Sequence, residues 1–126
     1  MINRRVVITG LGVISSLGIG WQKWWKNIMT GKSGISRITA FDSSIYDRHL
    51  AGEVKKFKAT DFVKDKSILN MGRASQLAVA ACKLALVDAK FKIRKSRNTK
   101  AGIIIGTTMG EPQVMEDFDT KMIPKG

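Results

Sequence analysis

The 126 residues are enough for one domain of ordinary size, and 44% of them are hydrophobic, which suffices to build a buried core. A net charge of +12 indicates first a solvated basic surface and next an acidic protein partner. The basic residues follow no nucleic-acid-binding motif, so we expect no nucleic acid as a partner. One cysteine excludes an internal disulfide, no Cys and His cluster has metal-ligand spacing, and no apolar run reaches the roughly 20 residues of a membrane span.

The chain opens with the run RVVITGLG at residues 5–12, in which β-branched residues lead into glycines. This pattern is typical of a strand buried on both faces, and it predicts one at residues 6–9. Apolar side chains then recur at helical spacing: Trp21, Trp24, Trp25, Ile28 and Met29. They predict an amphipathic helix that ends near Gly31 and packs its aromatic face on the sheet.

The remainder continues the α/β pattern. Residues 32–61 predict a loop that carries a brief strand near residues 50–54. An alanine-rich stripe predicts a second helix over residues 67–89, whose small side chains allow a neighbour to approach closely. After a basic linker, residues 103–105 repeat the buried-strand pattern and enter the glycine-rich turn at 106–110. We therefore expect an α/β fold with right-handed crossovers.

The glycines that follow the first strand invite a comparison with dinucleotide-binding loops. Gly10 and Gly12 match the first two glycines of the GxGxxG pattern, but Ser15 stands at the third. No acidic residue lies about twenty positions further on to bind a ribose. A small nucleotide-binding α/β protein therefore ranks as the third hypothesis for this chain.

Five separate stretches resemble the β-ketoacyl synthases of the thiolase-like fold. They are RRVVITGLGVIS at 4–15, LGIG at 17–20, WKNIMTGKSGI at 25–35, FD at 41–42 with AGEVKKF at 51–57, and IIIGTTMGE at 103–111. Each stretch alone is unspecific, but their order and spacing also match. The chain is accordingly similar to the N-terminal part of a β-ketoacyl-acyl carrier protein synthase of the 3-oxoacyl synthase II type.

This resemblance implies a fold and an activity. The expected fold is the N-terminal portion of a layered α/β/α thiolase-like structure, incomplete, with residues 1–126 forming one segment and no separate second domain. The implied reaction is decarboxylative condensation, in which an acyl group on a nucleophilic cysteine meets a malonyl group on a carrier protein. The family's catalytic cysteine and two histidines lie beyond residue 126, so we expect no catalytic residue in this chain, no cofactor and no activity.

Cys82 and His49 do not replace those residues. Cys82 lies in the middle of the predicted second helix, where backbone N–H groups are already used, so it is predicted to be a small buried apolar residue. His49 follows Asp47 and Arg48 in a loop, matches no catalytic histidine of the family, and is predicted to be a surface residue.

Three residues keep a functional prediction. Met109 matches the position of an apolar side chain that gates the acyl pocket in the family, although ordinary core packing explains it equally well. Lys66 matches a basic position that binds the acidic acyl carrier protein, and Lys64 is a second candidate. The next basic positions of the family are Leu69 and Asn70 in this chain.

The resemblance also implies partners and a location. We expect acyl carrier protein as a partner, and a homodimer or heterodimer when the whole family sequence is present. Because the sequence has neither a membrane-span pattern nor a secretory-signal pattern, the cytoplasm is the expected location. The alternative is a non-catalytic module that binds an acidic carrier protein. Because the strands at 6–9 and 103–105 are apolar on both faces, the 126 residues alone are expected to be partly folded or to associate.

Overall fold

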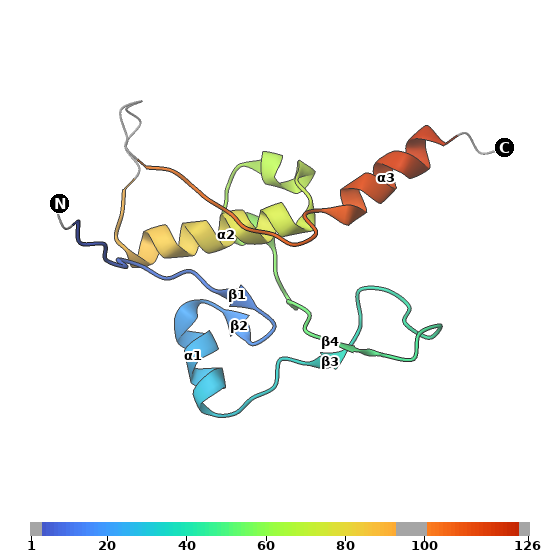
Figure 1. Ribbon diagram of the computed structural model, residues 1–126, viewed down its shortest axis with the longest axis horizontal. Coiled ribbons are helices and arrows are strands. Elements are labelled where there is room, and N and C mark those ends of the chain that lie inside the picture. The colour runs from blue at the N-terminus through green and yellow to red at the C-terminus, as the bar shows by residue number, and fades with distance from the viewer. Residues whose placement is uncertain (1–3, 93–100, 124–126) are drawn as a thin grey trace.

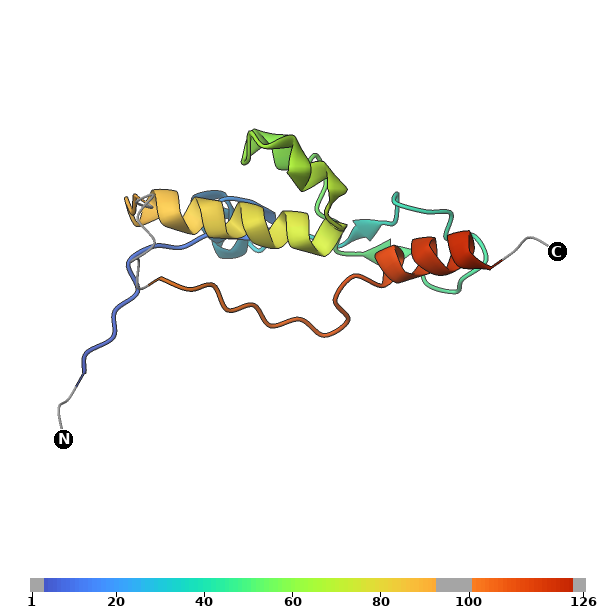
Figure 2. The ribbon, with the colours of Figure 1, turned by 90° about the horizontal axis from the view of Figure 1, so that it is seen from above.

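The computed structural model describes residues 4–92 and 101–123. In chain order the elements are β1 (Ile14–Ser15), β2 (Gly18–Ile19), α1 (Trp21–Met29), β3 (Ser36–Arg37), β4 (Leu50–Ala51), the 3-10 helices η1 (Ala59–Asp61) and η2 (Lys66–Asn70), α2 (Arg73–Asp88) and α3 (Pro112–Met122). Helix α2 lies at the centre, with the β1–β2 hairpin and α1 on one side, while α3 projects away from the body (Figure 1). The segment 101–110 runs alongside α2 in both ribbon views (Figure 2).

The two small sheets are antiparallel pairs. Ile14 faces Ile19 in the β1–β2 hairpin. Ser36 faces Ala51 in the β3–β4 pair. The brief strand predicted near residues 50–54 is thus confirmed in its first two residues.

Helix α1 has the predicted extent. It ends where Gly31 adopts a left-handed backbone with a φ of 64°, which a residue without Cβ reaches without strain. It packs on β2, and Trp21 Nε1 donates a hydrogen bond of 2.8 Å to Asp88 at the end of α2. The prediction that its aromatic face packs on a sheet was wrong: the helix contacts the adjoining short strand β2, no residue of α1 is buried, and Trp25, Ile28 and Met29 are exposed.

The single helix predicted over residues 67–89 is two helices in the structure. Asp65 accepts a hydrogen bond of 2.9 Å from the Ser67 amide and so begins η2, which ends at Asn70. Gly72 has an extended backbone and precedes the first residue of α2. The prediction of one continuous helix was wrong because Gly72 interrupts the helical backbone between two apolar stripes that share the same spacing.

The alanine face of α2 contacts the glycines that precede β1. A Cβ built on Gly10 would lie 2.5 Å from the carbonyl oxygen of Ala85, and one on Gly12 would overlap the carbonyl oxygen of Ala81. Leu11, between these glycines, donates its amide to an Asp88 carboxylate oxygen at 2.9 Å. The predicted close approach to the alanine-rich helix is therefore present, and the glycines are what permit it.

A small core lies between α2 and the 3-10 helices. Its buried members are Phe57, Ala59, Ile68 and Ala80. The Phe57 ring stacks on Phe62 with centroids 5.6 Å apart, and the Arg73 guanidinium carbon lies 4.7 Å from the Phe57 centroid, within the range of a cation–π contact. These contacts hold the segment before η1 against the start of α2.

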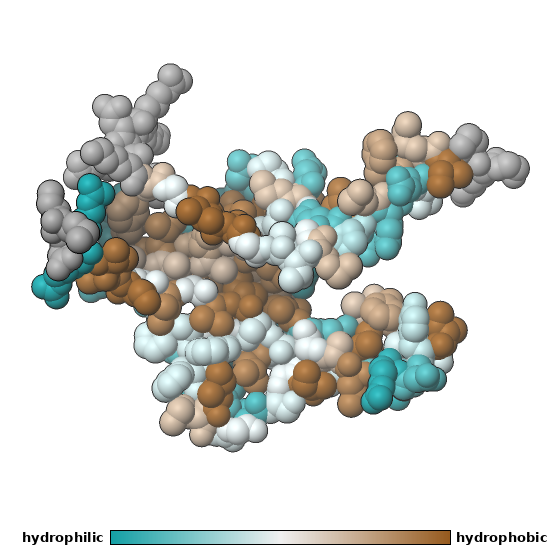
Figure 3. Space-filling model, viewed as in Figure 1, coloured by the Kyte–Doolittle hydropathy of each residue, from teal (hydrophilic) through white to brown (hydrophobic). Residues whose placement is uncertain are grey.

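Residues 6–9 and 103–105, predicted as buried strands, are not strands in the structure. Val6 is 93% exposed and Ile104 is 100% exposed. A strand exists only where a neighbouring backbone completes its ladder, and among the described residues neither segment has such a neighbour. Apolar side chains consequently gather on the surface, over the segment before β1 and over α2 (Figure 3).

Helix α3 was not predicted. Pro112 occupies its first turn, where a missing N–H costs no hydrogen bond and the fixed φ favours helix. In the part of the chain that the structure describes, no helix is long and apolar enough to cross a membrane.

Candidate functional site

The glycine-rich turn and the first half of α2 line an open pocket of about 290 Å³. Residues 105–107, 110 and 111 form one wall, and the facing wall is Ala74, Ser75, Ala78 and Val79. Small side chains on α2 leave room for a ligand, and both walls are mainly apolar. The motif predicted beside an acyl pocket therefore does line a pocket.

Glu111 joins the two walls. Its Oε1 accepts a hydrogen bond of 2.5 Å from the backbone N–H of Ser75, in the first turn of α2. The side chain occupies the space that a Cβ on Gly72 would fill. Hydrogen bonds from the side chain and then the backbone of Ser75 lower the pKa of this carboxyl, so that a negative charge stands at the positive end of the helix dipole.

The role of Glu111 was missed in the sequence. One signal could have indicated it: Gly72 at the N-cap has no side chain to accept from the first amides of α2. An acceptor from elsewhere in the chain was therefore needed, and the sequence does not say which residue supplies it.

Met109 lies at the glycine-rich turn but does not line the pocket, and it is 78% exposed. The turn is closed by a hydrogen bond of 3.0 Å from the Gly110 amide to Thr107 Oγ1, and Gly110 has a φ of 64°. In this arrangement the Met109 side chain is on the solvent side of the turn. Its assignment as a gate stays a prediction.

Lys64 and Lys66 flank Asp65 on the segment that leads from η1 into η2, and both are exposed. The hydrogen bond from the backbone of Ser67 lowers the pKa of Asp65. An acidic residue therefore stands between the two lysines in the sequence and favours its charged form. Neither lysine lines the pocket at the glycine-rich turn. The two predicted functions therefore occupy different places on the chain.

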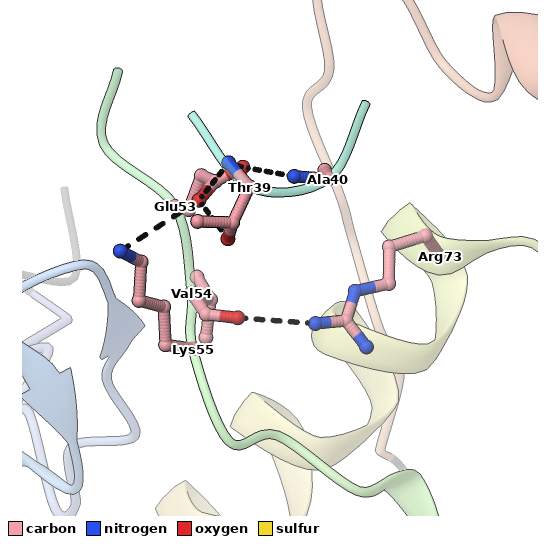
Figure 4. A network of polar contacts seen from close by, with 6 residues as sticks. All are labelled: Thr39, Ala40, Glu53, Val54, Lys55 and Arg73. Atoms are coloured by element: carbon pink, nitrogen blue, oxygen red, sulfur yellow. Dashed lines mark hydrogen bonds and ion pairs between the residues drawn. The ribbon is translucent and has the colours of Figure 1, made fainter. Parts of the chain in front are cut away.

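A polar network fixes the segment between β4 and η1 (Figure 4). The Glu53 carboxylate accepts from the Thr39 amide at 2.9 Å, from Thr39 Oγ1 at 2.8 Å and from the Ala40 amide at 2.8 Å. These bonds, chiefly the one from the Thr39 backbone, lower the pKa of Glu53. On the other side of this segment Arg73 donates to the Val54 carbonyl at 3.2 Å.

The structure places Cys82 and His49, for which no catalytic role was predicted, in partly buried positions. Cys82 is in the middle of α2, as predicted, but it is half-buried rather than fully buried. His49 is also half-buried, with Nδ1 3.4 Å from the Ser43 hydroxyl. Within residues 4–92 and 101–123, no three His, Cys, Asp or Glu side chains are grouped as metal ligands.

The fold and the glycine-rich turn define part of an α/β protein of the thiolase-like class. The family described as "Beta-ketoacyl synthase, N-terminal domain" matches residues 3–124, and the chain belongs to this family. The resemblance drawn from the five sequence stretches is thereby confirmed.

Individual relatives agree with this assignment. The chain is 41% identical over 123 residues to 3-oxoacyl-(acyl-carrier-protein) synthase 2 of Synechocystis sp., covering 98% of this chain and 30% of that protein. It is 36% identical over 124 residues to the protein of the same name from Staphylococcus aureus, again covering 98% and 30%. The solved structure of the ishigamide ketosynthase/chain length factor superposes with a TM-score of 0.67 at 40% identity, over 71% of this chain and 22% of that one. The chain thus spans about 30% of the length of the curated relatives it matches.

Proposed function

We propose that the chain is the N-terminal segment of a condensing enzyme that joins an acyl thioester to malonyl-acyl carrier protein with loss of carbon dioxide. The product would enter fatty-acid or polyketide biosynthesis. The observation that carries this proposal is the family match over residues 3–124. The pocket beside the glycine-rich turn supports it, because its mainly apolar walls suit an alkyl chain.

In this proposal the 126 residues supply binding surface and no chemistry. A condensing enzyme needs a thiolate nucleophile and N–H donors aimed at the thioester oxygen. Cys82 cannot fill this role, because it lies in mid-helix, where the neighbouring amides already donate within α2. The nucleophile, the oxyanion hole and the decarboxylating histidines would come from further family sequence.

The first experiment assays the 126-residue chain with acyl and malonyl carrier protein, measuring carbon dioxide release and 3-oxoacyl thioester. We expect neither product. Turnover that Cys82→Ala abolishes would overturn this division of roles. The same assay on a protein that also carries the family's catalytic sequence should give both products, and their absence there would count against the condensing function itself.

The second candidate function is a non-catalytic module that binds an acidic carrier protein. The net charge of +12 and the exposed Lys64 and Lys66 favour it. Titration of carrier protein should show weaker binding for Lys64→Glu with Lys66→Glu than for the control Lys83→Glu with Lys90→Glu, which makes the same change of charge elsewhere. Equal weakening by both pairs would mean that net charge, and not this surface, attracts the partner. The downstream reading frame separates this candidate from the first, since it either encodes the catalytic cysteine and histidines or does not.

The nucleotide-binding hypothesis gains no support from the arrangement of the first glycines. Gly10 and Gly12 lie against the backbone of α2, and this contact fills the space that a pyrophosphate would need. Calorimetric titration with NAD(P) should therefore show no tight binding, and tight binding would revive this hypothesis.

A further inference from the structure

A second depression, with a volume of about 470 Å³, lies apart from the glycine-rich turn. It is bounded by the β1–β2 hairpin, the first turn of α1, the segment 33–36 and the segment 53–56. Neither Met109 nor Lys64 nor Lys66 lines it. It is therefore separate from the glycine-rich turn and from those two lysines, and its ligand chemistry is independent of the proposed function.

The charged residues that line this depression are mainly basic. Lys23, Lys55 and Lys56 line it, and Glu53 is the one carboxylate among the lining residues, all of which the structure describes. The Glu53 oxygens are already occupied by Thr39 and Ala40, and the nearest ammonium, that of Lys55, is 3.9 Å away. Lys55 thus offsets Glu53, and Lys23 and Lys56 leave an excess of positive charge along the lining that favours an anion.

The backbone at Lys56 is unusual. Its φ of 58° places a residue with a Cβ in the left-handed region, which side chains other than glycine seldom adopt. Residues held in such conformations gather at ligand sites, where surrounding contacts fix them. Here the conformation belongs to a lysine that lines the depression.

Hydroxyl donors complete the lining. Ser15 Oγ accepts from the Leu17 amide at 3.2 Å, and Ser33 Oγ accepts from the Ile35 amide at 3.1 Å. A hydroxyl that accepts from the backbone keeps its own O–H as a donor. Both serines line the depression, so each can donate to an oxygen of a ligand.

Ser16 also lines the depression, at the point where its walls meet. A Cβ on Gly34 would overlap its hydroxyl, and a Cβ on Gly52 would lie 3.1 Å from it. The two glycines therefore let the segments 33–36 and 53–56 close around Ser16. The lining that results combines hydroxyl donors and ammonium groups drawn from four segments of the chain.

We propose that this depression binds the phosphate group of a small phosphorylated molecule. A phosphate offers several acceptor oxygens and a charge of about −2, which suits a lining that contains hydroxyl and lysine side chains. The volume exceeds what one phosphate fills and lies in the range of small-molecule sites, which is about 300–1,000 Å³. Leu17, Ile19 and Ile35 supply apolar contacts for the rest of the ligand.

The test uses equilibrium dialysis of the purified 126-residue chain with radiolabelled phenyl phosphate, which has a phosphate and a compact apolar body. Dialysis measures bound probe whatever the association state of the chain. We expect saturable binding, competition by inorganic phosphate at higher concentration and none by phenol. Competition by phenol equal to that by phosphate would overturn the proposal, because the apolar body alone would then account for binding.

Three variants separate a built site from general charge attraction. Lys56→Gln and Lys23→Gln should each weaken binding roughly fivefold to tenfold, as loss of one charged hydrogen bond does. Lys83→Gln removes the same charge from the exposed part of α2 and should leave the dissociation constant within about twofold, since a distant surface charge is largely screened. Equal weakening by all three would show that the probe follows net charge, which contradicts the proposal.

Ser33→Ala removes a hydroxyl from an exposed loop position and leaves every charge in place. It should weaken binding roughly threefold to tenfold, which corresponds to one hydrogen bond from a solvent-exposed hydroxyl. Far-ultraviolet circular dichroism of each variant verifies that the helices are retained. Unchanged affinity in Ser33→Ala and Lys56→Gln, with helices intact, would place the phosphate elsewhere and overturn the proposal.

Discussion

Single carboxylates join segments of this chain that are distant in sequence. Glu53 accepts from Thr39 and Ala40, Glu111 from Ser75, and Asp88 from Leu11 and Trp21. Hydrogen bonds to the charged form lower the pKa of all three groups. Each of these contacts is therefore strongest while the carboxylate is ionised.

Glu53→Gln should lower the thermal unfolding temperature at neutral pH. An amide oxygen at the position of Oε1 can still accept from the Thr39 and Ala40 amides, but the NH2 group that replaces Oε2 is a donor, so the bond from Thr39 Oγ1 is lost and the remaining bonds no longer go to a charged group. Because the folded pKa is lowered, the carboxylate's contribution is complete above the ordinary glutamate value of about 4.3 and disappears as the pH falls through the folded value. The difference in unfolding temperature between Glu53→Gln and the unaltered protein should consequently shrink towards pH 3.

Glu116→Gln is the control for this change, since it alters an exposed glutamate on α3 by the same one charge. We expect its unfolding temperature to follow that of the unaltered protein from pH 7 to pH 3. A difference between Glu53→Gln and the unaltered protein that widens with acidification would contradict the assignment.

Met109 should influence acyl-chain selectivity in a protein that also carries the catalytic sequence. If Met109 gates the acyl site, a bulky Met109→Trp side chain at the glycine-rich turn should disfavour long acyl chains relative to short ones by roughly tenfold, and Met109→Ala should favour long chains relative to the unaltered protein. The measurement is kcat/KM across acyl lengths. If both variants leave the selectivity unchanged, Met109 is an ordinary apolar residue and the gate prediction is wrong.

Among individual residues, the sequence identified those that belong to a recognisable motif and missed those whose contacts are with residues distant in sequence. Met109 and Lys66 could be named because they fall within or beside recognisable stretches. Glu111 could not be assigned to the start of α2, because its partner Ser75 lies 36 positions away and the hydrogen bond exists only after folding. The lining of the basic depression was missed for the same reason, since it draws on four separate segments.

Among the elements, α1 was predicted with its bounds because its five apolar residues keep helical spacing and Gly31 supplies a stop. The break before α2 was not, because a single glycine inside an apolar stripe is compatible with a continuous helix. Helix α3 was overlooked, although Pro112 in its first turn is a recognised start signal. Periodicity thus identified helices with a partner face more readily than one that projects into solvent.

The contact between α2 and the first glycines makes a specific prediction. Gly12→Ala should destabilise the chain by about 1–3 kcal/mol, because the new Cβ would overlap the Ala81 carbonyl and lie 2.7 Å from the Ala85 amide nitrogen. Denaturant unfolding measures the loss.

The matched control is Gly102→Ala, at a position where a Cβ meets nothing within 4 Å. This change should be neutral or stabilising by up to about 1 kcal/mol, since it reduces only the freedom of the unfolded chain. Equal effects of the two alanines would mean that the glycine contact does not hold α2 and the N-terminal segment together.

For the molecule as a whole, the sequence correctly indicated the α/β family but not the state of its two most apolar segments. Residues 6–9 and 103–105 have the composition of buried strands. Such a composition indicates that a segment needs neighbouring strands to pair with and helices to cover its faces, but it does not show whether the chain provides them. In the described residues the sheets that exist are short pairs elsewhere, and these two segments stay exposed.

Association of the purified 126-residue chain is the expected result of this exposure. Unpaired apolar segments recruit other chains, and the net charge of +12 opposes this without satisfying their backbone groups. Light scattering should report oligomers at neutral pH, and Val7→Lys with Ile104→Lys should reduce them several-fold at unchanged helical content. A monodisperse monomer with one sharp unfolding transition would show that these residues form a complete cooperative domain.

The hydrogen bond from Leu11 to Asp88 also has a consequence for synthesis on the ribosome. It joins residues 77 positions apart, so the N-terminal segment is made long before the end of the helix that binds it. At typical elongation rates of about 5–20 residues per second, this interval is roughly 4–15 s. Throughout that time Gly10, Leu11 and Gly12 have no completed α2 to contact. The N-terminal segment therefore waits for its partner helix until residue 88 has been made, and slower translation lengthens this wait.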